Sequence, residues 1–463
     1  MLFEVLLSKR NTMQKYSFFS VLTLLYCCSG LFAQISIQKL ANAFEQSPEN
    51  KYASISLLIV DLDKDSVVAN INSDKTLMCA STAKLFSTFS ALDLLGSDYR
   101  PTTSIYTDGY IDSSGALQGN LIIRGGGDGT LGSKYFHNED DQFEFLNLWK
   151  DTLRGMGIHS IKYSVITDGS SFGYAGVPDG WDWSDMGNYY GAGASGINFH
   201  DNTVKYHFQT FSPGRKVKLI ETFPLDENLK FRHSIKSANI RNDQSYLFGA
   251  PYSQDRFGIG SLPSNRKVFT VKGSMHDPEY MLAKEFSRFL KDSNIHVAGE
   301  SYGFRSLGLD PIPYDSLSLL FVHEGQRIKD IIDVTNLNSV NLFAEGLLNL
   351  VGYEKKGFGS TTSGIKGLYD NLQNKVNLDG MKLRDGSGLS RKNAVSAQNF
   401  CNLLAYIYKS SLYDEFKSSL AIAGETGTLK NICRSQMASG RMFAKSGTLS
   451  NVKAYSGYVK SDS

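Results

Sequence analysis

The chain has 463 residues, of which 41% are hydrophobic and 20% charged, and its formal net charge is +2. That length is enough for two or three domains, and so small a charge gives no indication of binding to nucleic acid or to a strongly anionic membrane surface. The eight histidines show no paired metal-ligand spacing, so we expect no metal and no cofactor.

The first 33 residues predict a secretory signal peptide (1–33). Lys9, Arg10 and Lys15 precede an apolar run over 18–28, and Ala33 offers a small residue for cleavage. Without this segment 430 residues remain (463 − 33), and no later apolar run approaches the roughly 20 residues of a membrane span. We therefore expect a soluble mature chain with no transmembrane span. Its three cysteines (Cys79, Cys401 and Cys433) are too few for a disulfide framework and allow at most one bridge.

The first part of the mature chain predicts a β-hairpin followed by a helix. Strand-like runs at 52–61 and 66–72 are joined by Asp-Lys-Asp, and from Thr82 apolar residues recur at helical spacing until Gly96. Ser81 is therefore expected at the point where the strands give way to an amphipathic helix.

The middle of the chain, from about 97 to 310, has a different pattern. Short strand-like runs and two amphipathic helices, near 142–155 and 279–292, alternate with turns rich in Gly, Asp and Asn, which is typical of one or two α+β domains. The last third is predicted to be helical and to end in a β-type tail; its segments are 326–334, 339–351, 362–375 and 397–408, with the tail at 442–459.

Two stretches in the middle resemble catalytic or phosphate-binding motifs without meeting their structural requirements. The run 169–173 fits Gly-x-Ser-x-Gly, but the Gly- and Pro-containing sequence YAGVPDGW follows instead of the required helix. The run 127–134 is glycine-rich like a phosphate loop, yet its Ser and Lys stand in the wrong order. Both are more simply explained as turns.

Ser81 and Lys84 form a Ser-x-x-Lys pair, which can place a nucleophile beside its base. Residues three apart share a face of a helix, and burial can lower the pKa of a lysine by roughly 3 to 5 units, so that it accepts a proton. The alternative is that Ser81 is only the polar start of a helix. Spacing alone does not decide, because the same pattern occurs four more times, at Ser36/Lys39, Ser264/Lys267, Ser363/Lys366 and Ser450/Lys453.

Two further motifs follow in chain order. Ser339-Val340-Asn341 presents a hydroxyl and an amide where a helix is expected to open, and Lys445-Ser446-Gly447-Thr448 lies on the predicted terminal strand. Taken singly, Ser339 is more simply a helix cap and Lys445 a solvated strand residue. Together, Ser-x-x-Lys, Ser-x-Asn and Lys-Ser-Gly in this order form the signature of penicillin-recognising serine enzymes.

With these motifs the chain resembles the low-molecular-mass class C penicillin-binding proteins, the D-Ala-D-Ala carboxypeptidases and endopeptidases of the penicillin-binding protein 4 type. The resemblance covers most of the mature chain and extends to LIIRGGGDGTL (121–131), GWDWSDMGNYYGAGASGINF (180–199), RDGSGLSRKN (384–393) and AGETGTLKN (423–431). It implies an α+β fold in which a β-lactamase-like, penicillin-recognising serine transpeptidase-like catalytic domain is interrupted by inserted α+β domains.

The resemblance also implies the domain boundaries. Between Lys84 and Ser339 lie 254 residues (339 − 84 − 1), where members of this family carry inserted domains. The catalytic domain would then be discontinuous, from 34 to 98 and from 312 to 463, with the inserted domain or domains at 99–311. Family members continue with another strand and a terminal helix, so we expect Ser463 to end an incomplete chain.

The resemblance assigns roles to the motif residues. Ser81 would be the nucleophile and Lys84 its base, while Ser339 and Asn341 complete the catalytic set. Substrate binding would fall to Lys445, Ser446, Gly447 and Thr448. The implied activity is that of a periplasmic serine-type D-Ala-D-Ala carboxypeptidase or endopeptidase that forms an acyl-enzyme with peptidoglycan stem peptides and with β-lactams. The alternatives are a serine β-lactamase and a non-catalytic peptidoglycan-binding protein.

Three positions depart from the family pattern. Val340 stands where Asp is commoner, Ser446 where Thr is commoner, and Cys79 where Pro is frequent. Because the side chain of residue 340 is not expected to take part in the chemistry and Ser446 keeps a hydroxyl, neither of the first two changes the predicted reaction.

Overall fold

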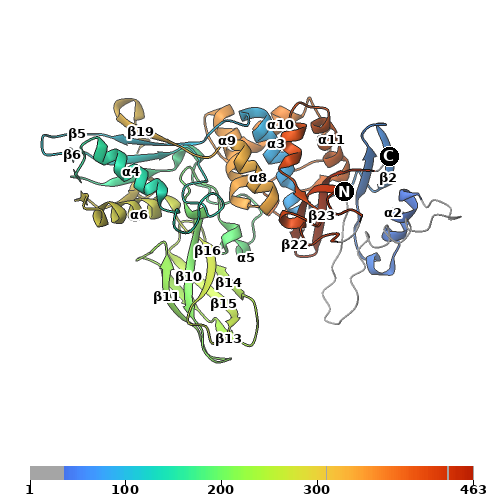
Figure 1. Ribbon diagram of the computed structural model, residues 1–463, viewed down its shortest axis with the longest axis horizontal. Coiled ribbons are helices and arrows are strands. Elements are labelled where there is room, and N and C mark those ends of the chain that lie inside the picture. The colour runs from blue at the N-terminus through green and yellow to red at the C-terminus, as the bar shows by residue number, and fades with distance from the viewer. Residues whose placement is uncertain (1–35, 309, 435–436, 462–463) are drawn as a thin grey trace. The chain divides into compact units, whose positions relative to one another are not determined.

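The computed structural model describes residues 36–308, 310–434 and 437–461, so the predicted signal peptide lies outside the described residues. The chain divides into two units (Figure 1). Unit 1 is made of the described residues up to Ser97 together with 329–340 and those from Ile365 onward, and unit 2 of 98–328 and 341–364. The predicted domain boundaries, 34–98 with 312–463 against 99–311, remain predictions. Within the described ranges, no helix is both long enough and apolar enough to cross a membrane.

Unit 1 combines helices with small antiparallel sheets. The predicted hairpin is confirmed, because β1 (Leu57–Asp61) pairs with β2 (Ser66–Ile71) in antiparallel register. The β-type tail forms the hairpin of β22 (Met442–Leu449) and β23 (Val452–Val459), with β21 (Ala421–Ile422) beside β22. The other elements are α2 (Ile37–Glu45), β3 (Thr76–Leu77), α3 (Lys84–Leu95), α8 (Ile328–Asn338), α10 (Thr361–Leu372), β20 (Val395–Ser396), α11 (Ala397–Tyr408) and α12 (Tyr413–Ser418). Of these, α8 and α10 begin in unit 2 and continue into unit 1.

Helix α3 is buried along most of its length rather than amphipathic, so this part of the prediction was wrong. Every residue from Lys84 to Leu92 is buried. Two of the hydroxyl groups on the helix find acceptors inside the unit: Ser87 donates to the carbonyl oxygen of Gly386 at 2.8 Å, and Thr88 to that of Lys84 at 2.6 Å. Small polar residues with satisfied hydrogen bonds can therefore occupy a face that their polarity assigns to solvent.

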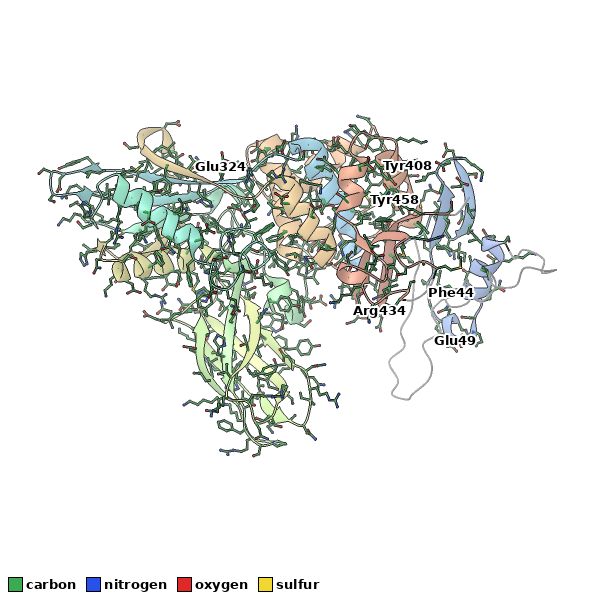
Figure 2. All side chains as sticks on the ribbon, in the orientation of Figure 1. Phe44, Glu49, Glu324, Tyr408, Arg434 and Tyr458 are labelled. Carbon is green, nitrogen blue, oxygen red and sulfur yellow. The ribbon has the colours of Figure 1, made fainter. Side chains whose placement is uncertain are left out.

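Strand β23 is held against α11 by tyrosine side chains. The hydroxyl of Tyr458 donates to the carbonyl oxygen of Leu404 at 2.9 Å, and its ring lies 5.2 Å from that of Tyr413 in an edge-to-face arrangement. Tyr408, labelled in Figure 2, lies at the end of α11. Its hydroxyl donates to Asp63, in the turn between β1 and β2, at 2.9 Å. The contacts of Tyr458 hold the terminal hairpin, which carries the Lys-Ser-Gly motif, against α11 and α12, and the contact of Tyr408 joins α11 to the β1–β2 hairpin.

Unit 2 contains four sheets and five helices among its described residues. The largest sheet has the strand order β18-β9-β7-β4-β19, and a smaller one the order β17-β8-β6-β5. Two further sheets have the order β11-β10-β16 and β12-β15-β13, with β14 added to β15. The strands are β4 (Thr102–Thr107), β5 (Tyr110–Ile111), β6 (Ala116–Gln118), β7 (Leu121–Gly125), β8 (Ser160–Ile161), β9 (Val165–Asp168), β10 (Thr203–Gln209), β11 (Lys218–Phe223), β12 (Lys230–His233), β13 (Lys236–Ala238), β14 (Gln244–Phe248), β15 (Asp255–Pro263), β16 (Phe269–Ser274), β17 (His296–Val297), β18 (Tyr302–Gly303) and β19 (Ser318–Glu324); the helices are α4 (Glu144–Gly155), α5 (Trp183–Met186), α6 (Pro278–Asp292), α7 (Phe304–Leu307) and α9 (Asn341–Lys356).

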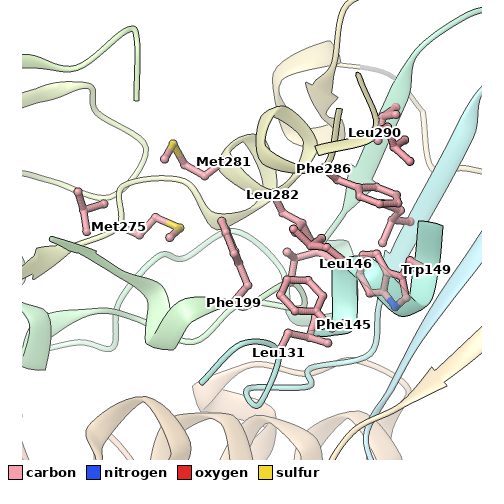
Figure 3. Close-up of a cluster of buried hydrophobic side chains, with 14 of the residues drawn as sticks. Leu131, Phe145, Leu146, Trp149, Phe199, Met275, Met281, Leu282, Phe286 and Leu290 are labelled. Carbon is pink, nitrogen blue, oxygen red and sulfur yellow. The ribbon is translucent and has the colours of Figure 1, made fainter. Parts of the chain in front are cut away.

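The hydrophobic core of unit 2 is organised around α4 and α6. Phe145, Trp149 and Phe286 are buried there, with the ring of Trp149 5.2 Å from Phe145 and 5.4 Å from Phe286, both edge to face (Figure 3). Such aromatic pairs contribute about 0.5–1.5 kcal/mol beyond their burial. The two amphipathic helices predicted in the middle of the chain are thus confirmed, and they bury their apolar faces together.

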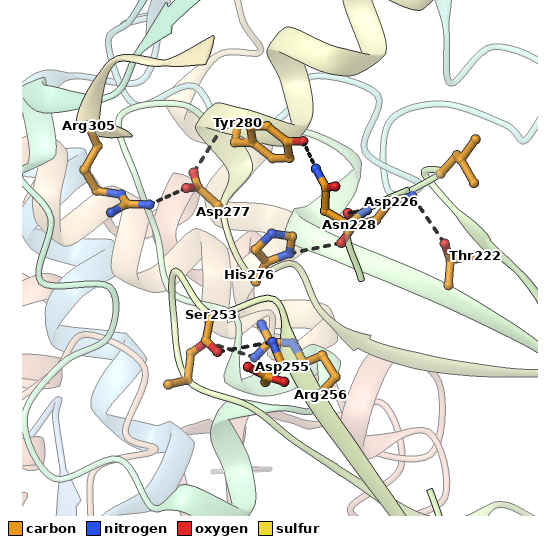
Figure 4. Close-up of polar contacts among 12 residues, drawn as sticks. Thr222, Asp226, Asn228, Ser253, Asp255, Arg256, His276, Asp277, Tyr280 and Arg305 are labelled. Carbon is orange, nitrogen blue, oxygen red and sulfur yellow. Dashed lines mark hydrogen bonds and ion pairs between the residues drawn. The ribbon is translucent and has the colours of Figure 1, made fainter. Parts of the chain in front are cut away.

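Buried charged groups connect α6 to its surroundings in unit 2 (Figure 4). At the start of the helix, Asp277 accepts from Arg305 at 2.6 Å, and His276 lies 3.5 Å from the carboxylate of Asp226. Burial lowers the pKa of His276, an effect that the negative charge of Asp226 opposes. Glu279, the second residue of the helix, accepts from the hydroxyl of Tyr174 at 2.9 Å, and burial raises its pKa to about 7.

Candidate active site

Ser81 and Lys84 lie side by side in unit 1. Ser81 belongs to a short 3₁₀ turn, Ala80–Ala83, and Lys84 is the first residue of α3, directly after that turn. The Nζ of Lys84 lies 3.1 Å from the Oγ of Ser81, and the lysine side chain is completely buried. The hydroxyl is therefore in hydrogen-bond contact with an amine that is shielded from water.

The turn around Ser81 is tighter than the predicted helix start. Ala80, immediately before the serine, has a φ of 46°, a left-handed conformation that costs energy for a residue with a Cβ. The hydroxyl of Thr82 donates to the carbonyl oxygen of Cys79 at 2.6 Å and braces the turn from the other side. Ser81 thus stands on a strained turn before the helix rather than at the helix's own first position.

A loop beyond α10 supplies a second contact to the buried lysine, which sequence reasoning missed. The Nζ of Lys84 donates to the carbonyl oxygen of Ser387 at 2.7 Å. Asp385 is completely buried and holds this loop, because its carboxylate accepts from the amides of Gly388 at 2.9 Å and Ser390 at 2.6 Å and from the side chain of Asn393 at 2.7 Å. The stretch RDGSGLSRKN stood out in the sequence, but nothing in it indicated that a main-chain carbonyl would be the contacting group.

Lys445 and Ser339 form the second close pair in unit 1. The Nζ of Lys445 donates to the Oγ of Ser339 at 2.8 Å and to the carbonyl oxygen of Ser446 at 2.8 Å. Lys445 is fully buried, and burial together with the positive charge of Lys84 holds its pKa well below the usual value. Lys445 is therefore not the solvated strand residue that its sequence alone would suggest.

The sequence predicted that a helix opens at Ser339, and this was wrong. Helix α9 begins at Asn341, while Ser339 lies in the connection after α8 with a φ of 61°. This left-handed conformation separates the end of α8 at Asn338 from the start of α9 at Asn341.

Strand β22 runs against the turn that carries Ser81, and Gly447 makes the approach close. A Cβ on Gly447 would lie 2.9 Å from the amide nitrogen of Ser81 and 2.8 Å from the carbonyl oxygen of Cys79. Both groups belong to the backbone, so neither can swing aside, and only glycine fits. Next to it, Ser446 donates to the hydroxyl of Thr428 at 2.8 Å, and Thr448 accepts from Lys453 at 2.9 Å.

Asn341 belongs to unit 2, where it is the first residue of α9. Its side-chain amide donates to the carbonyl oxygen of Tyr190 at 2.8 Å. Tyr190 lies in the stretch GWDWSDMGNYYGAGASGINF, so two segments that stood out in the sequence are joined here. In unit 1 the structure brings together Ser81, Lys84, Ser339, Lys445, Ser446 and Gly447.

Cys79 is a buried thiol two residues before Ser81. Burial, reinforced by the negative charge of Asp385, raises the pKa of this thiol to about 12. Because the thiolate is the reactive form of cysteine, Cys79 is chemically inert at neutral pH. Among the residues that the structure describes, no cluster of three or more His, Cys, Asp or Glu side chains could hold a metal ion.

Comparison with known proteins shows the family. The family model described as the D-Ala-D-Ala carboxypeptidase 3 (S13) family matches residues 36–463. The chain is 26% identical over 436 residues to a D-alanyl-D-alanine carboxypeptidase of Actinomadura sp. (strain R39), a match that covers 90% of this chain and 77% of the relative. It is also 24% identical to the D-alanyl-D-alanine carboxypeptidase DacB of Haemophilus influenzae, over 92% of this chain and 86% of the relative.

Solved structures show the same fold. The crystal structure of penicillin binding protein 4 (dacB) from Haemophilus influenzae superposes with a TM-score of 0.74 at 22% identity, covering 88% of this chain and 87% of that one. The predicted fold class is thereby confirmed: an α+β, penicillin-recognising fold with inserted domains. The resemblance noted in the sequence is confirmed as well, and the chain belongs to the D-Ala-D-Ala carboxypeptidase 3 (S13) family of peptidases.

Proposed function

We propose that this serine-type D-Ala-D-Ala carboxypeptidase, a penicillin-binding member of the S13 family, works through Ser81 as its nucleophile. The observation that carries the proposal is the 3.1 Å contact between the Oγ of Ser81 and the buried Nζ of Lys84. Lys84 takes the hydroxyl proton as the Oγ attacks the carbonyl carbon of the penultimate D-Ala. A bond forms between that carbon and the Oγ, and the bond to the nitrogen of the terminal D-Ala breaks.

The second pair, Ser339 and Lys445, delivers the proton that the departing amine requires. Ser339 is hydrogen-bonded to Lys445 at 2.8 Å, and burial holds the pKa of Lys445 well below its usual value, which favours proton transfer through the pair. Asn341 orients the amide of the substrate. Water then attacks the ester on Ser81: its oxygen bonds to the carbonyl carbon and the bond to the Oγ breaks, which releases the shortened peptide. Lys84 returns its proton to the Oγ of Ser81, and the proton lost by the water restores the Ser339–Lys445 pair.

Binding of the substrate's carboxylate falls to the motif on β22. Lys445, Ser446 and Thr448 are the proposed partners of the terminal carboxylate, and Gly447 allows the strand to lie close to the turn that carries the nucleophile. The backbone amides of Ser81 and Thr448 would hold the oxyanion, where removal of one such donor costs about 10² to 10³ in rate.

The substrates we assign are peptidoglycan stem peptides, and β-lactams would mimic them and acylate Ser81. The predicted signal peptide and the bacterial carboxypeptidases among the relatives support action outside the cytoplasm, in the periplasm. The same acylation of Ser81 could also cleave peptide crosslinks, which is the endopeptidase activity of the family that the sequence resembles. Digestion of purified crosslinked muropeptides separates the two, because a carboxypeptidase releases free D-Ala and an endopeptidase releases monomers.

Labelling with a fluorescent penicillin tests the proposal. Intact protein should take up one label per chain, and Ser81→Ala should take up none. Ser450→Ala is the matched control, since Ser450 has the same spacing to Lys453 but is exposed beyond β22, and its labelling should be unchanged. Equal labelling of Ser81→Ala and intact protein would refute the assignment. Release of hydrolysed penicillin within minutes would instead identify a β-lactamase.

A further inference from the structure

A cavity of about 470 Å³ in unit 2 lies outside the groups used in the proposed reaction. Its size falls within the range of roughly 300–1,000 Å³ that is usual for ligand sites. It is formed between β14, β16 and the 3₁₀ turn Tyr189–Gly191. Asn188 joins these elements, because its side-chain oxygen accepts from the amide of Leu247 at 3.1 Å and its backbone bridges to Gly273.

Three tyrosines give the cavity an aromatic wall. Tyr189 and Tyr246 are each about half exposed, at 49% and 51%, and line the cavity together with Tyr190. The rings of Tyr189 and Tyr190 lie 5.5 Å apart, edge to face, and the hydroxyl of Tyr190 is 3.3 Å from Asp185. These contacts hold the rings in place before any ligand arrives, which lowers the entropic cost of binding.

The polar groups of the cavity are mostly neutral. Asn188 and Gln244 contribute amides and Ser245 and Thr270 hydroxyls, and one carboxylate, Asp243, is balanced by one ammonium, Lys272. The lining contains no arginine, so it lacks the forked cation that recognises phosphate. A neutral ligand with apolar faces and a rim of hydroxyl and amide groups matches this lining, which is the chemistry of an N-acetylated amino sugar.

An aromatic strip continues from the cavity along β14. Tyr246 and Phe248 are two residues apart on this strand and therefore share a face. The ring of Phe248 lies 6.0 Å from that of Trp183, in a stacked arrangement, and 6.2 Å from that of Phe257 on the neighbouring strand. Trp183 and Phe257 are about half exposed. A row of exposed rings suits a chain of sugars better than a single small molecule.

The cavity is connected to the Ser-x-Asn motif, the second of the three motifs in the catalytic signature. The carbonyl oxygen of Tyr190, whose ring lines the cavity, accepts from the side-chain amide of Asn341 at 2.8 Å. We propose that the cavity and the aromatic strip bind the amino-sugar glycan of peptidoglycan, to which the stem peptides are attached. This inference rests on the proposed function for the identity of the glycan, and it adds a saccharide-binding site to the enzyme.

Titration of the full chain with the peptide-free disaccharide repeat of peptidoglycan, followed by calorimetry, tests the proposal. Tyr246→Ser and Gln244→Ala remove a ring and an amide from the exposed face of β14 and should each weaken binding about fivefold, equivalent to about 1 kcal/mol. The matched control is Tyr110→Ser, an exposed tyrosine on β5 in another sheet, and it should bind like the intact protein. If Tyr246→Ser fails to fold, Gln244→Ala carries the test.

Two outcomes would overturn the inference: no heat of binding with intact protein, or equal affinity of the intact protein and both β14 variants. A bare stem pentapeptide that competes with the disaccharide for the site would also overturn it, since the cavity would then be a peptide site. The measurement needs no catalysis, so absence of penicillin labelling would refute the role of Ser81 and leave the glycan result standing. A kinetic measurement gives a second readout. We expect the intact protein to have a higher kcat/KM for the disaccharide-pentapeptide than for the bare pentapeptide, and this ratio should be smaller in Tyr246→Ser.

Discussion

The Nζ of Lys445 lies 2.8 Å from the Oγ of Ser339, although the two residues are 106 positions apart in the chain. Their contact joins the terminal β-hairpin to the connection between α8 and α9. Because Lys445 is fully buried and feels the positive charge of Lys84, its proton is held less tightly than that of an exposed lysine. Folding therefore perturbs the titration of this residue, and the perturbation can be measured.

Stability should depend on pH through Lys445. Since its pKa in the folded protein lies well below 10.5, the unfolded chain binds the additional proton, and stability should rise as the pH is raised towards 10.5. Lys445→Met should flatten this dependence in thermal denaturation, and Lys382→Met, which removes an exposed lysine of unit 1, should not. Parallel curves for the intact protein and Lys445→Met would contradict the prediction.

Gly447→Ala should slow acylation by penicillin without unfolding the protein. The new Cβ would meet the backbone of Ser81 and Cys79 at 2.9 and 2.8 Å and push β22 away from the nucleophile. A displacement of about 1 Å in an active site can cost roughly 10²-fold in rate, which is the loss we expect in the second-order rate constant of labelling.

Gly346→Ala on α9 provides the control for this glycine. A Cβ there meets no atom within 4 Å, and alanine in a helix is favoured over glycine by about 0.5–1 kcal/mol. Labelling should be unaffected and the melting temperature unchanged or slightly higher. Equal labelling rates for both glycine variants would show that the close approach of β22 does not matter.

Asp385→Ala should reduce both stability and acylation. It leaves the donors of Gly388, Ser390 and Asn393 unpaired inside unit 1, and each unsatisfied buried group costs about 1–3 kcal/mol. The loop would then no longer present the carbonyl oxygen of Ser387 to Lys84. Asp385→Asn keeps one acceptor oxygen and should lose less in both readouts, chemical denaturation and penicillin labelling. Normal stability together with normal labelling in Asp385→Ala would contradict the prediction.

A second pH effect should come from Glu279 in unit 2. Burial raises its pKa from 4.5 to about 7, so the folded protein binds the additional proton in this range and stability should fall as the pH rises from 4.5 to 7. Glu279→Gln should remove that part of the dependence in denaturation curves. Glu227→Gln, at an exposed position, should leave it intact. A Glu279→Gln curve that still falls over this range would contradict the prediction.

The sequence predicts most of the regular elements because their periodicity is strong and their ends are marked. Helix α6 was expected near 279–292 and runs from Pro278 to Asp292, with Asp277 as its capping residue. Helix α11 matches its predicted span of 397–408. Prediction failed where tertiary contacts override local pattern: α3 is buried on its polar side, and the left-handed Ser339 delays α9 until Asn341.

The motifs identify candidate site residues but not their surroundings. Order and spacing point to Ser81, Lys84 and Lys445, whereas the contact between Lys445 and Ser339 depends on how distant segments fold. The contact from Lys84 to the carbonyl oxygen of Ser387 could not be predicted from the types of side chain, since every residue carries a main-chain carbonyl. Pairing between two-residue strands such as β3 and β20 leaves no periodicity to detect.

The division of unit 1 into separate stretches has a consequence for biosynthesis. Ser81 and Lys84 emerge early, but Lys445 and Gly447 lie near the end of the described chain, after all of unit 2 has been made. Contacts between residues so distant in sequence form late and slowly. A nascent or truncated chain that stops before β22 would carry the proposed nucleophile and its base without the strand that binds the substrate's carboxylate. Such an enzyme would stay inactive until β22 has been made.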